Sequence, residues 1–186
     1  YMSLFLVDLY SIIFKSFYAI PSLRTSKGYP TNAILGTLKS IIKIIKQFNV
    51  QNLIIVLDTG KKTFRNEIFP DYKANRLEAP DELKIQFSVI TDLLKQLGFF
   101  LIEKEGLEAD DLIFSISKKF NNQNIFIFSS DKDLYQLVSD KVKLISESKK
   151  GLIIIDENEV KNKFNVLPSQ IVDFLALTGD SSDNIP

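Results

Sequence analysis

The 186-residue sequence contains no histidine, no cysteine and no tryptophan. Without imidazole or thiol groups there is no Ser-His-Asp triad, no cysteine nucleophile, no His/Cys zinc site and no disulfide framework. Chemistry on this chain must therefore use carboxylates, Lys, Arg, Tyr, Ser or Thr side chains, or a bound cofactor. The lack of cysteine also agrees with a reducing compartment.

Long hydrophobic runs are missing as well. The longest uncharged apolar runs, such as residues 53–57 and 125–128, are far shorter than the roughly 18 residues that span a bilayer. Asp8 interrupts the apolar segment 3–7, so the pattern of a secretory signal is absent. We therefore expect a cytoplasmic protein with no membrane partner.

An excess of charge of either sign is the third feature that the sequence lacks, because 23 Lys and Arg residues balance 23 Asp and Glu residues. Taken alone, a formal charge of zero argues against nucleic acid as a partner, because proteins that bind nucleic acid are commonly basic. The hydrophobic fraction of 45% and the charged fraction of 25% are ordinary for a globular protein. The length predicts one domain with a sizeable core.

Short apolar runs rich in β-branched residues alternate with segments of helical period, which is typical of βα units. The sequence predicts an α/β fold with a central twisted, mainly parallel sheet and helices on both faces. Residues 21–30 form an expected loop, and residues 60–80 an expected arch or disordered loop. The expected strands are 4–8, 53–58, 99–103, 125–129, 143–145 and 152–155. The expected helices are 32–48, 81–97, 108–120, 132–138, 157–164 and 168–177.

Acidic side chains follow the ends of the expected strands, where ligands bind in open α/β sheets. A single Asp there is more often a helix cap. Nine carboxylates at one rim would instead repel one another, by about 4 kcal/mol for a pair about 4 Å apart at an effective dielectric near 20, which exceeds what a cap contributes. We therefore expect cations among them. The nine are Asp8, Asp58, Glu108, Asp110, Asp111, Asp131, Asp133, Asp180 and Asp183.

Hard divalent cations suit such a set of oxygen ligands, with Mg²⁺ as the first choice and Mn²⁺ as a substitute. So many acids exceed the needs of one ion, which favours two or more. Paired ions are the usual apparatus for attack at phosphorus, since one activates water and the other stabilises the leaving oxygen. The residues alone thus predict phosphoryl chemistry without a histidine base.

Basic residues outnumber the remaining acids once those nine are set aside, by 23 to 14. In segment 60–80, basic and aromatic residues alternate as in proteins that bind single strands, so we expect phosphate contacts there. For the lysines on predicted helix faces we expect a solvated role. The segment residues are Lys61, Lys62, Arg65, Lys73 and Arg76, and the helix lysines are Lys39, Lys43, Lys46, Lys118 and Lys119.

Seven short motifs carry a resemblance that runs from Leu4 to Pro186. They are Val7-Asp8, Leu57-Asp58, KTFR at 62–65, YKANR at 72–76, GLEADD at 106–111, SDKD at 130–133 and GDSSDNIP at 179–186. In order and spacing they resemble the 5′-nuclease (5′-3′ exonuclease) domain of bacterial DNA polymerase I, whose wider relatives are the flap endonucleases.

The resemblance implies a PIN-like 5′-nuclease fold and a Mg²⁺-dependent, structure-selective nuclease that removes 5′ flaps, RNA primers and 5′-terminal nucleotides in replication and repair. It implies catalytic roles for Asp8, Asp58, Asp110, Asp111 and Lys15. A first metal cluster would use Asp8, Asp58, Glu108, Asp110 and Asp111, and a second would use Asp131, Asp133, Asp180 and Asp183. The implied DNA-binding residues are Lys15, which stands where the family usually has Arg, and Arg65, Tyr72, Lys73 and Arg76.

The resemblance further implies that residues 1–186 are a catalytic domain, and that the family's helix-hairpin-helix DNA-binding region would follow Pro186. The expected partners are DNA with a 5′ end or flap and a fused or associated DNA polymerase. We expect a monomer in the bacterial cytoplasm, at the nucleoid during replication and repair.

Two other functions stay open at this point. A ribonuclease of the PIN type uses a similar acidic rim, although the long basic segment and the motif at 179–186 argue against it. A non-catalytic DNA-binding module is the second alternative. The retained acids argue against that module, because a pure binder gains nothing from negative charge that faces phosphate.

Overall fold

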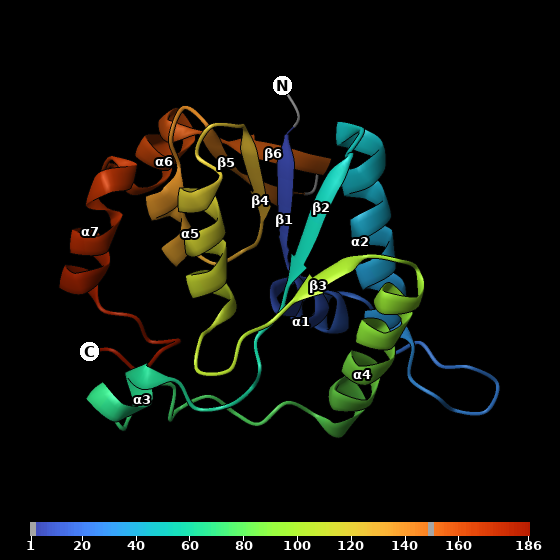
Figure 1. Ribbon diagram of the computed structural model, residues 1–186. Helices are drawn as coiled ribbons and strands as arrows, with labels where there is room; N and C mark the ends of the chain where they lie inside the picture. The colour runs from blue at the N-terminus through green and yellow to red at the C-terminus, as the bar shows by residue number, and fades with distance from the viewer. Residues whose placement is uncertain (1–2, 149–150) are drawn as a thin grey trace.

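The computed structural model describes residues 3–148 and 151–186. Its centre is a six-stranded sheet in the order β3-β2-β1-β4-β5-β6 (Figure 1). Neighbouring strands from β3 to β5 are parallel, and β6 pairs antiparallel with β5 through a hairpin. The strands are β1 (Leu4–Asp8), β2 (Asn52–Val56), β3 (Phe100–Ile102), β4 (Ile125–Phe128), β5 (Val142–Ser148) and β6 (Gly151–Ile155).

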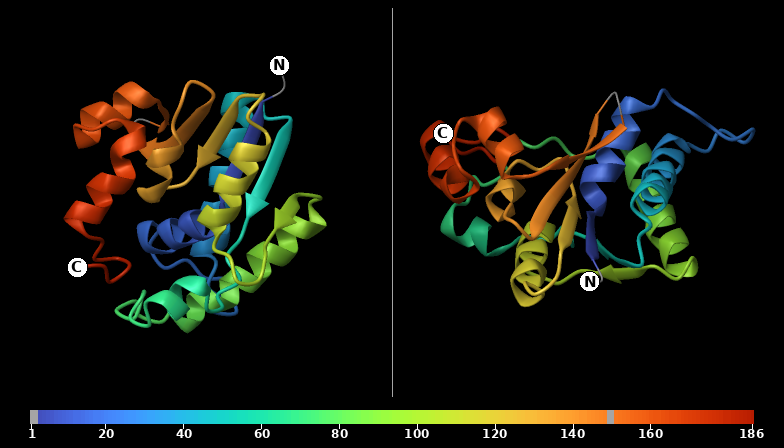
Figure 2. Two further views of the ribbon diagram at one scale, coloured as in Figure 1. Left: turned by 60° about the vertical axis from the view of Figure 1, so that its left-hand side comes forward. Right: turned by 90° about the horizontal axis from the view of Figure 1, so that it is seen from above.

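Helices cover both faces of this sheet (Figure 2). Phe5 and Val7 of β1 pack in one core with α1, α2 and α4, while Leu4 and Leu6 pack in the other with α5, α6 and α7. Side chains alternate between the two faces of a strand, so a strand covered on both sides reads as one apolar run. The helices are α1 (Leu9–Ala19), α2 (Asn32–Phe48), α3 (Phe64–Ile68), α4 (Asp81–Gln96), α5 (Ala109–Lys119), α6 (Glu157–Phe164) and α7 (Ile171–Thr178).

The expected fold class is confirmed, and several elements begin and end where the sequence predicts. Two expected helices differ in type. Residues 133–137 form a 3₁₀ helix, and segment 168–177 starts with a 3₁₀ turn before α7. At the first of these, the Asp131 side chain accepts the Asp133 N–H at 2.9 Å, and this local bond starts a tighter turn than an α-helix. Among the described residues, no helix is long and apolar enough to cross a membrane.

Segment 60–80 departs from the expected arch or disordered loop. It contains the short helix α3, and turns follow it at residues 70–75. Contacts distant in sequence hold these turns, since the Lys73 N–H donates to the Asp183 carbonyl at 3.0 Å and the Asn184 side chain donates to the Asp71 carbonyl at 2.9 Å. Periodicity in the sequence carries no sign of such contacts.

Helices α1 and α2 cross at Gly36, where a Cβ atom would lie 2.5 Å from Ser16 Cβ. We predict that Gly36→Ala destabilises the protein by about 1–3 kcal/mol, because the helices must move apart to admit the methyl group. Urea unfolding followed by circular dichroism measures the loss. Thr37→Val is the matched control, since it replaces a buried hydroxyl that has no hydrogen-bond partner within residues 3–148 and 151–186 and should leave stability unchanged or higher. A Gly36→Ala variant as stable as the wild type contradicts the prediction.

Candidate metal centre

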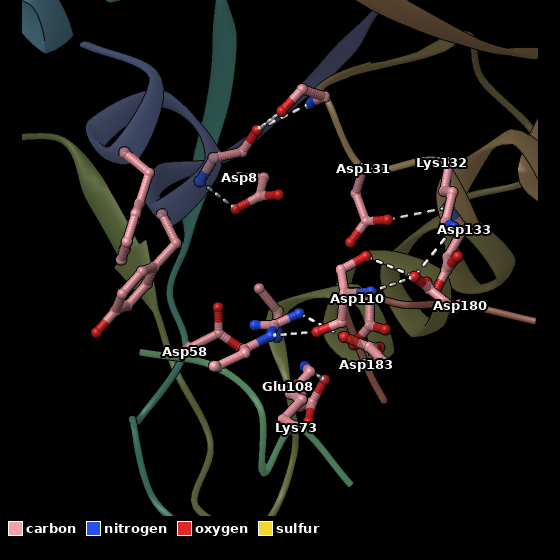
Figure 3. Close-up of a pocket in the computed structure, with 17 residues that line it drawn as sticks. Asp8, Asp58, Lys73, Glu108, Asp110, Asp131, Lys132, Asp133, Asp180 and Asp183 are labelled. Carbon is pink, nitrogen blue, oxygen red and sulfur yellow. Dashed lines mark hydrogen bonds and ion pairs between the residues drawn. The ribbon is translucent and has the colours of Figure 1, made fainter. Parts of the chain in front are cut away.

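The carboxyl ends of β1, β2 and β4 open into a cavity of about 480 Å³ (Figure 3). Eight of the nine predicted acids line this cavity, together with three basic side chains. If all are ionised, five formal negative charges remain uncompensated by the lining. The eight acids are Asp8, Asp58, Glu108, Asp110, Asp131, Asp133, Asp180 and Asp183, and the bases are Lys73, Arg76 and Lys132.

Asp8 is the last residue of β1 and also the N-cap of α1, which fixes its carboxylate at the base of the cavity. One oxygen accepts the Ser11 N–H at 3.2 Å, and the other accepts the Ser129 hydroxyl at 2.7 Å. Burial raises the pKa of Asp8 to about 6, although both hydrogen bonds oppose this shift. Asp8 thus caps α1 and also lines the cavity.

Asp58 and Asp110 meet at the N-terminus of α5. Asp58 Oδ1 accepts the Ala109 N–H at 2.8 Å, so the loop after β2 is tied to the first turn of the helix. Burial raises the pKa of Asp58 and brings that of Asp110 to about 6, while Arg65 acts against the shift at Asp110. In the ion-free protein both carboxylates thus hold their protons more tightly than free aspartate does.

A second group of acids lies on the other side of the cavity. Oxygens of Asp133, Asp180 and Asp183 lie within 4.8 Å of one another. Burial, followed by repulsion from Asp131, raises the pKa of Asp133 to about 6, and its buried Oδ1 accepts no hydrogen bond from the described residues. Such an orphaned oxygen beside two further carboxylates fits a hard divalent cation.

The four residues of segment 60–80 predicted to bind DNA contact acids in the structure. Arg65 forms a bidentate pair with Asp111 at 2.8 and 2.9 Å. The Lys73 Nζ lies 2.6 Å from Glu108 Oε2, and an Arg76 nitrogen lies 2.5 Å from Asp183 Oδ1. The Tyr72 hydroxyl lies 3.1 Å from Glu108 Oε2 and 3.2 Å from Asp183 Oδ2, and burial followed by these charges raises the pKa of Tyr72.

Asp111, which the resemblance implies as a catalytic metal ligand, is not among the residues that line the cavity. Both of its oxygens are engaged, because Arg65 holds them and Oδ2 also accepts the Glu108 N–H at 3.0 Å. The hydrogen bonds from Arg65 lower the pKa of Asp111. Its position in the first turn of α5 makes it a helix cap and an anchor for α3.

Lys15, for which we expect a phosphate contact, does not line the cavity either. Its Nζ lies 3.3 Å from Glu147 Oε2 on β5. Lys15 lies one turn beyond Ser11 on α1, in a small pocket that shares Ser11 and Ser130 with the cavity. The hairpin of β5 and β6, which the sequence places far from Lys15, brings this carboxylate within reach.

Several residues in or beside the cavity carry no sequence signal that singled them out. The Ser129 hydroxyl donates to Asp8 and accepts the Asp131 N–H at 3.0 Å, so it joins the two groups of acids. Lys132 lies 3.0 Å from Asp180 Oδ1. Tyr10 also lines the cavity, from the first turn of α1. The adjacency of Ser129 and Lys132 to Asp131 was the available hint, since residues that follow a strand share its end.

The raised pKa of Asp110 predicts a pH dependence of stability in the presence of a chelator. The folded protein holds this proton more tightly than the unfolded chain, so the Asp110 carboxylate lowers stability increasingly as pH rises from 3.8 to about 6. We expect Asp110→Asn to gain stability over the wild type across this range, by on the order of 2 kcal/mol at pH 7. Urea unfolding at pH 4.5 and at pH 7 measures the difference. A difference that is the same at both values contradicts the shift.

Fold and site together define a class: parallel α/β proteins with a carboxylate-lined, histidine-free centre suited to divalent ions. Residues 3–165 match the family described as the 5′-3′ exonuclease N-terminal resolvase-like domain, and the chain belongs to this family. It is 44% identical to a 5′-3′ exonuclease of Aquifex aeolicus, over 99% of this chain and 64% of the relative. It is 39% identical to DNA polymerase I of Pseudomonas aeruginosa over 98% of this chain and 20% of that protein.

Solved structures show the same architecture. The chain matches T5 5′-exonuclease with bound zinc ions at a TM-score of 0.78 and 25% identity, over 99% of this chain and 69% of the other. A T5 flap endonuclease in complex with DNA and metal ions gives a TM-score of 0.77 and 26% identity, over 98% and 68%. The chain spans 64% and 61% of the length of two of the 5′-3′ exonucleases that it matches.

Proposed function

We propose that this chain is the catalytic part of a divalent-metal-dependent, structure-selective 5′-nuclease. It would hydrolyse DNA phosphodiesters at 5′ ends and 5′ flaps, and so remove RNA primers and flaps in replication and repair. The observation that carries this proposal is the cavity with eight carboxylates and an orphaned buried oxygen on Asp133. The DNA and metal ions bound by the T5 flap endonuclease support it.

The donor set fits Mg²⁺, and Mn²⁺ as its substitute, because every ligand is an oxygen. Asp8, Asp58, Glu108 and Asp110 would hold one ion. Another would be held by the second group together with Asp131, that is by Asp131, Asp133, Asp180 and Asp183. When bound, the ions supply activation of water and neutralisation of charge on the leaving oxygen. The number of acids favours two or more ions.

The chain's own residues would position the substrate. Lys73 and Arg76 lie at the cavity wall and carry the donors that a phosphate needs. Arg65 and Tyr72 would support them from the same segment, and Lys15 would contact a phosphate from α1. Hydrolysis would break the bond between phosphorus and the 3′ oxygen. One product would therefore keep a phosphate at its 5′ end, and the leaving fragment would carry a free 3′ hydroxyl.

We further propose that residues 1–186 are the catalytic domain. A helix-hairpin-helix region would add affinity for duplex DNA. The match to a fifth of DNA polymerase I supports a fused or associated polymerase as partner. The protein would act as a monomer in the bacterial cytoplasm, at the nucleoid.

Titration of Mg²⁺ against a labelled 5′-flap DNA tests the proposal, with Ca²⁺ as the control ion. We expect cleavage at the flap junction with Mg²⁺ or Mn²⁺ and binding without cleavage with Ca²⁺. A flap of RNA sequence on the same duplex separates the PIN-type ribonuclease, which would cut RNA strands and spare DNA. Binding to the flap without cleavage under any divalent ion would instead identify a non-catalytic module.

A further inference from the structure

One carboxylate outside the cavity binds two lysines. Glu147 on β5 accepts from Lys15 of α1, at 3.3 Å through Oε2, and from Lys43 of α2, at 3.1 Å through Oε1. The Lys15 Nζ also lies 3.4 Å from the Glu147 carbonyl oxygen. Helices α1 and α2 lie on the same face of the sheet, and residues of β5 and β6 pack in the core on that face (Figure 2).

This arrangement differs from the ion pairs at the cavity wall. There, Lys73, Arg76 and Lys132 each face a carboxylate of their own. Among the ion pairs of the described residues, Glu147 is the one carboxylate that two basic side chains share. Two ammonium groups on one carboxylate leave one formal positive charge, and both lysine side chains are about 40% exposed, so an anion reaches them from solvent.

Lys15 and its partner Glu147 lie beside the acidic cavity. The pocket that holds Lys15 and Glu147 shares Ser11 and Ser130 with the cavity. The two serine hydroxyls lie 2.6 Å apart, and Ser11 Oγ accepts the Ser130 N–H at 2.9 Å. Two hydrogen-bonded serines thus line both the acidic cavity and the pocket that holds Lys15 and Glu147.

We propose that Lys43, together with Lys15, binds a backbone phosphate of the DNA strand whose neighbouring phosphodiester lies in the acidic cavity. Glu147 is the positioning residue, since it holds the two ammonium groups toward one point. This inference rests on the proposed nuclease function. It reassigns Lys43, for which the sequence favours a solvated role on the face of α2.

The alternative is a purely structural role, in which Glu147 only links α1 and α2 to β5. The two roles predict different changes in DNA affinity for the variants at Lys43 and Glu147. A mechanical clamp loses the same contact whichever partner is removed, so variants at Lys43 and Glu147 would behave alike. At a phosphate site the lysine attracts the strand and the carboxylate repels it, so the two variants act in opposite directions.

The experiment measures the affinity of the whole chain for a 5′-flap DNA in Ca²⁺, from 50 to 200 mM salt, for Lys43→Ala and Glu147→Gln. We expect Lys43→Ala to weaken binding by about fivefold and to lower the salt slope by about 0.7 to 0.9, the value of one phosphate contact. Glu147→Gln should tighten binding by about twofold to fivefold. Lys46→Ala, in the exposed last turn of α2, is the matched control and should leave the slope unchanged.

Thermal unfolding of each variant runs in parallel, and Lys43→Gln replaces Lys43→Ala if the alanine variant does not fold. An unchanged salt slope in the Lys43 variant, or weaker binding by Glu147→Gln, overturns the proposal. Inorganic phosphate is then added as a competitor of the flap DNA. A site for free phosphate would be saturated at millimolar concentration, whereas a contact made only within the DNA strand would not. A wild-type chain that neither binds nor cleaves the flap overturns the proposed function itself, whereas normal cleavage with an unchanged slope removes this inference alone.

Discussion

Replacement of Asp110 by Asn is expected to reduce cleavage of a 5′-flap DNA by about 1000-fold or more, while DNA binding in Ca²⁺ stays within about threefold of the wild type. Asp110 lines the cavity beside Asp58 and Glu108, in the group of acids that would hold one ion. Loss of one charged ligand removes several kcal/mol of stabilisation of the charge that develops at phosphorus, and each 1.36 kcal/mol is a factor of about ten in rate. Single-turnover cleavage measures the effect.

Two comparisons make this result specific. Asp131→Asn should lose cleavage to a similar degree, because Asp131 lines the same cavity from the loop after β4. Asp92→Asn, an exposed change on α4, should retain the wild-type rate. Binding is expected to survive in the first two variants, since removal of a negative charge does not repel phosphate. Full activity of either cavity variant would exclude that residue from the mechanism.

Mg²⁺ is expected to raise the melting temperature by about 5–10 °C at a concentration 100-fold above its dissociation constant. A ligand at that concentration adds about 2.7 kcal/mol, and a domain of this length shifts by about 2–4 °C per kcal/mol. The physical reason is the excess of five formal negative charges in the cavity, which oppose folding until a cation compensates them. Differential scanning fluorimetry with and without a chelator measures the shift.

The chelator should also abolish cleavage, and excess Mg²⁺ should restore it. NaCl at matched ionic strength is the control, because general screening weakens repulsion without occupying the site. Asp133→Asn should show a smaller Mg²⁺-induced shift than the wild type, since Asp133 provides the buried orphaned oxygen. Equal shifts with NaCl and MgCl₂ would mean that the carboxylates do not form a specific ion site.

The positions of the strands along the sequence and the gathering of acids at their ends could be predicted because both follow from local patterns. The apolar run Leu4–Asp8 forms β1 with the predicted bounds, and the run at 125–129 forms β4 with one residue fewer. Parallel strands end at the same edge of a sheet, so Asp8 and Asp131 meet there despite their separation in sequence. For these residues the position at a strand end was sufficient evidence.

Predictions that depended on the direction of a side chain were less secure. Asp110 and Asp111 are neighbours on α5, and the 100° turn between successive helical residues points the first into the cavity and the second to Arg65. A linear motif treats the two alike. Lys15 carries a flexible side chain, and its partner Glu147 lies on a hairpin 132 residues away in sequence, so no local pattern predicts their contact.

The sequence by itself determined the chemistry: it offers oxygen ligands and no imidazole or thiol, and its alternating apolar runs and helices require a sheet whose strand ends collect those ligands. Tertiary structure alone decided which carboxylates share the cavity and which are neutralised, such as Asp111 by Arg65 and Glu147 by two lysines. The reason is physical. Periodicity within a segment fixes which face is buried, whereas charge pairing depends on distances of a few ångströms between segments that only packing brings together.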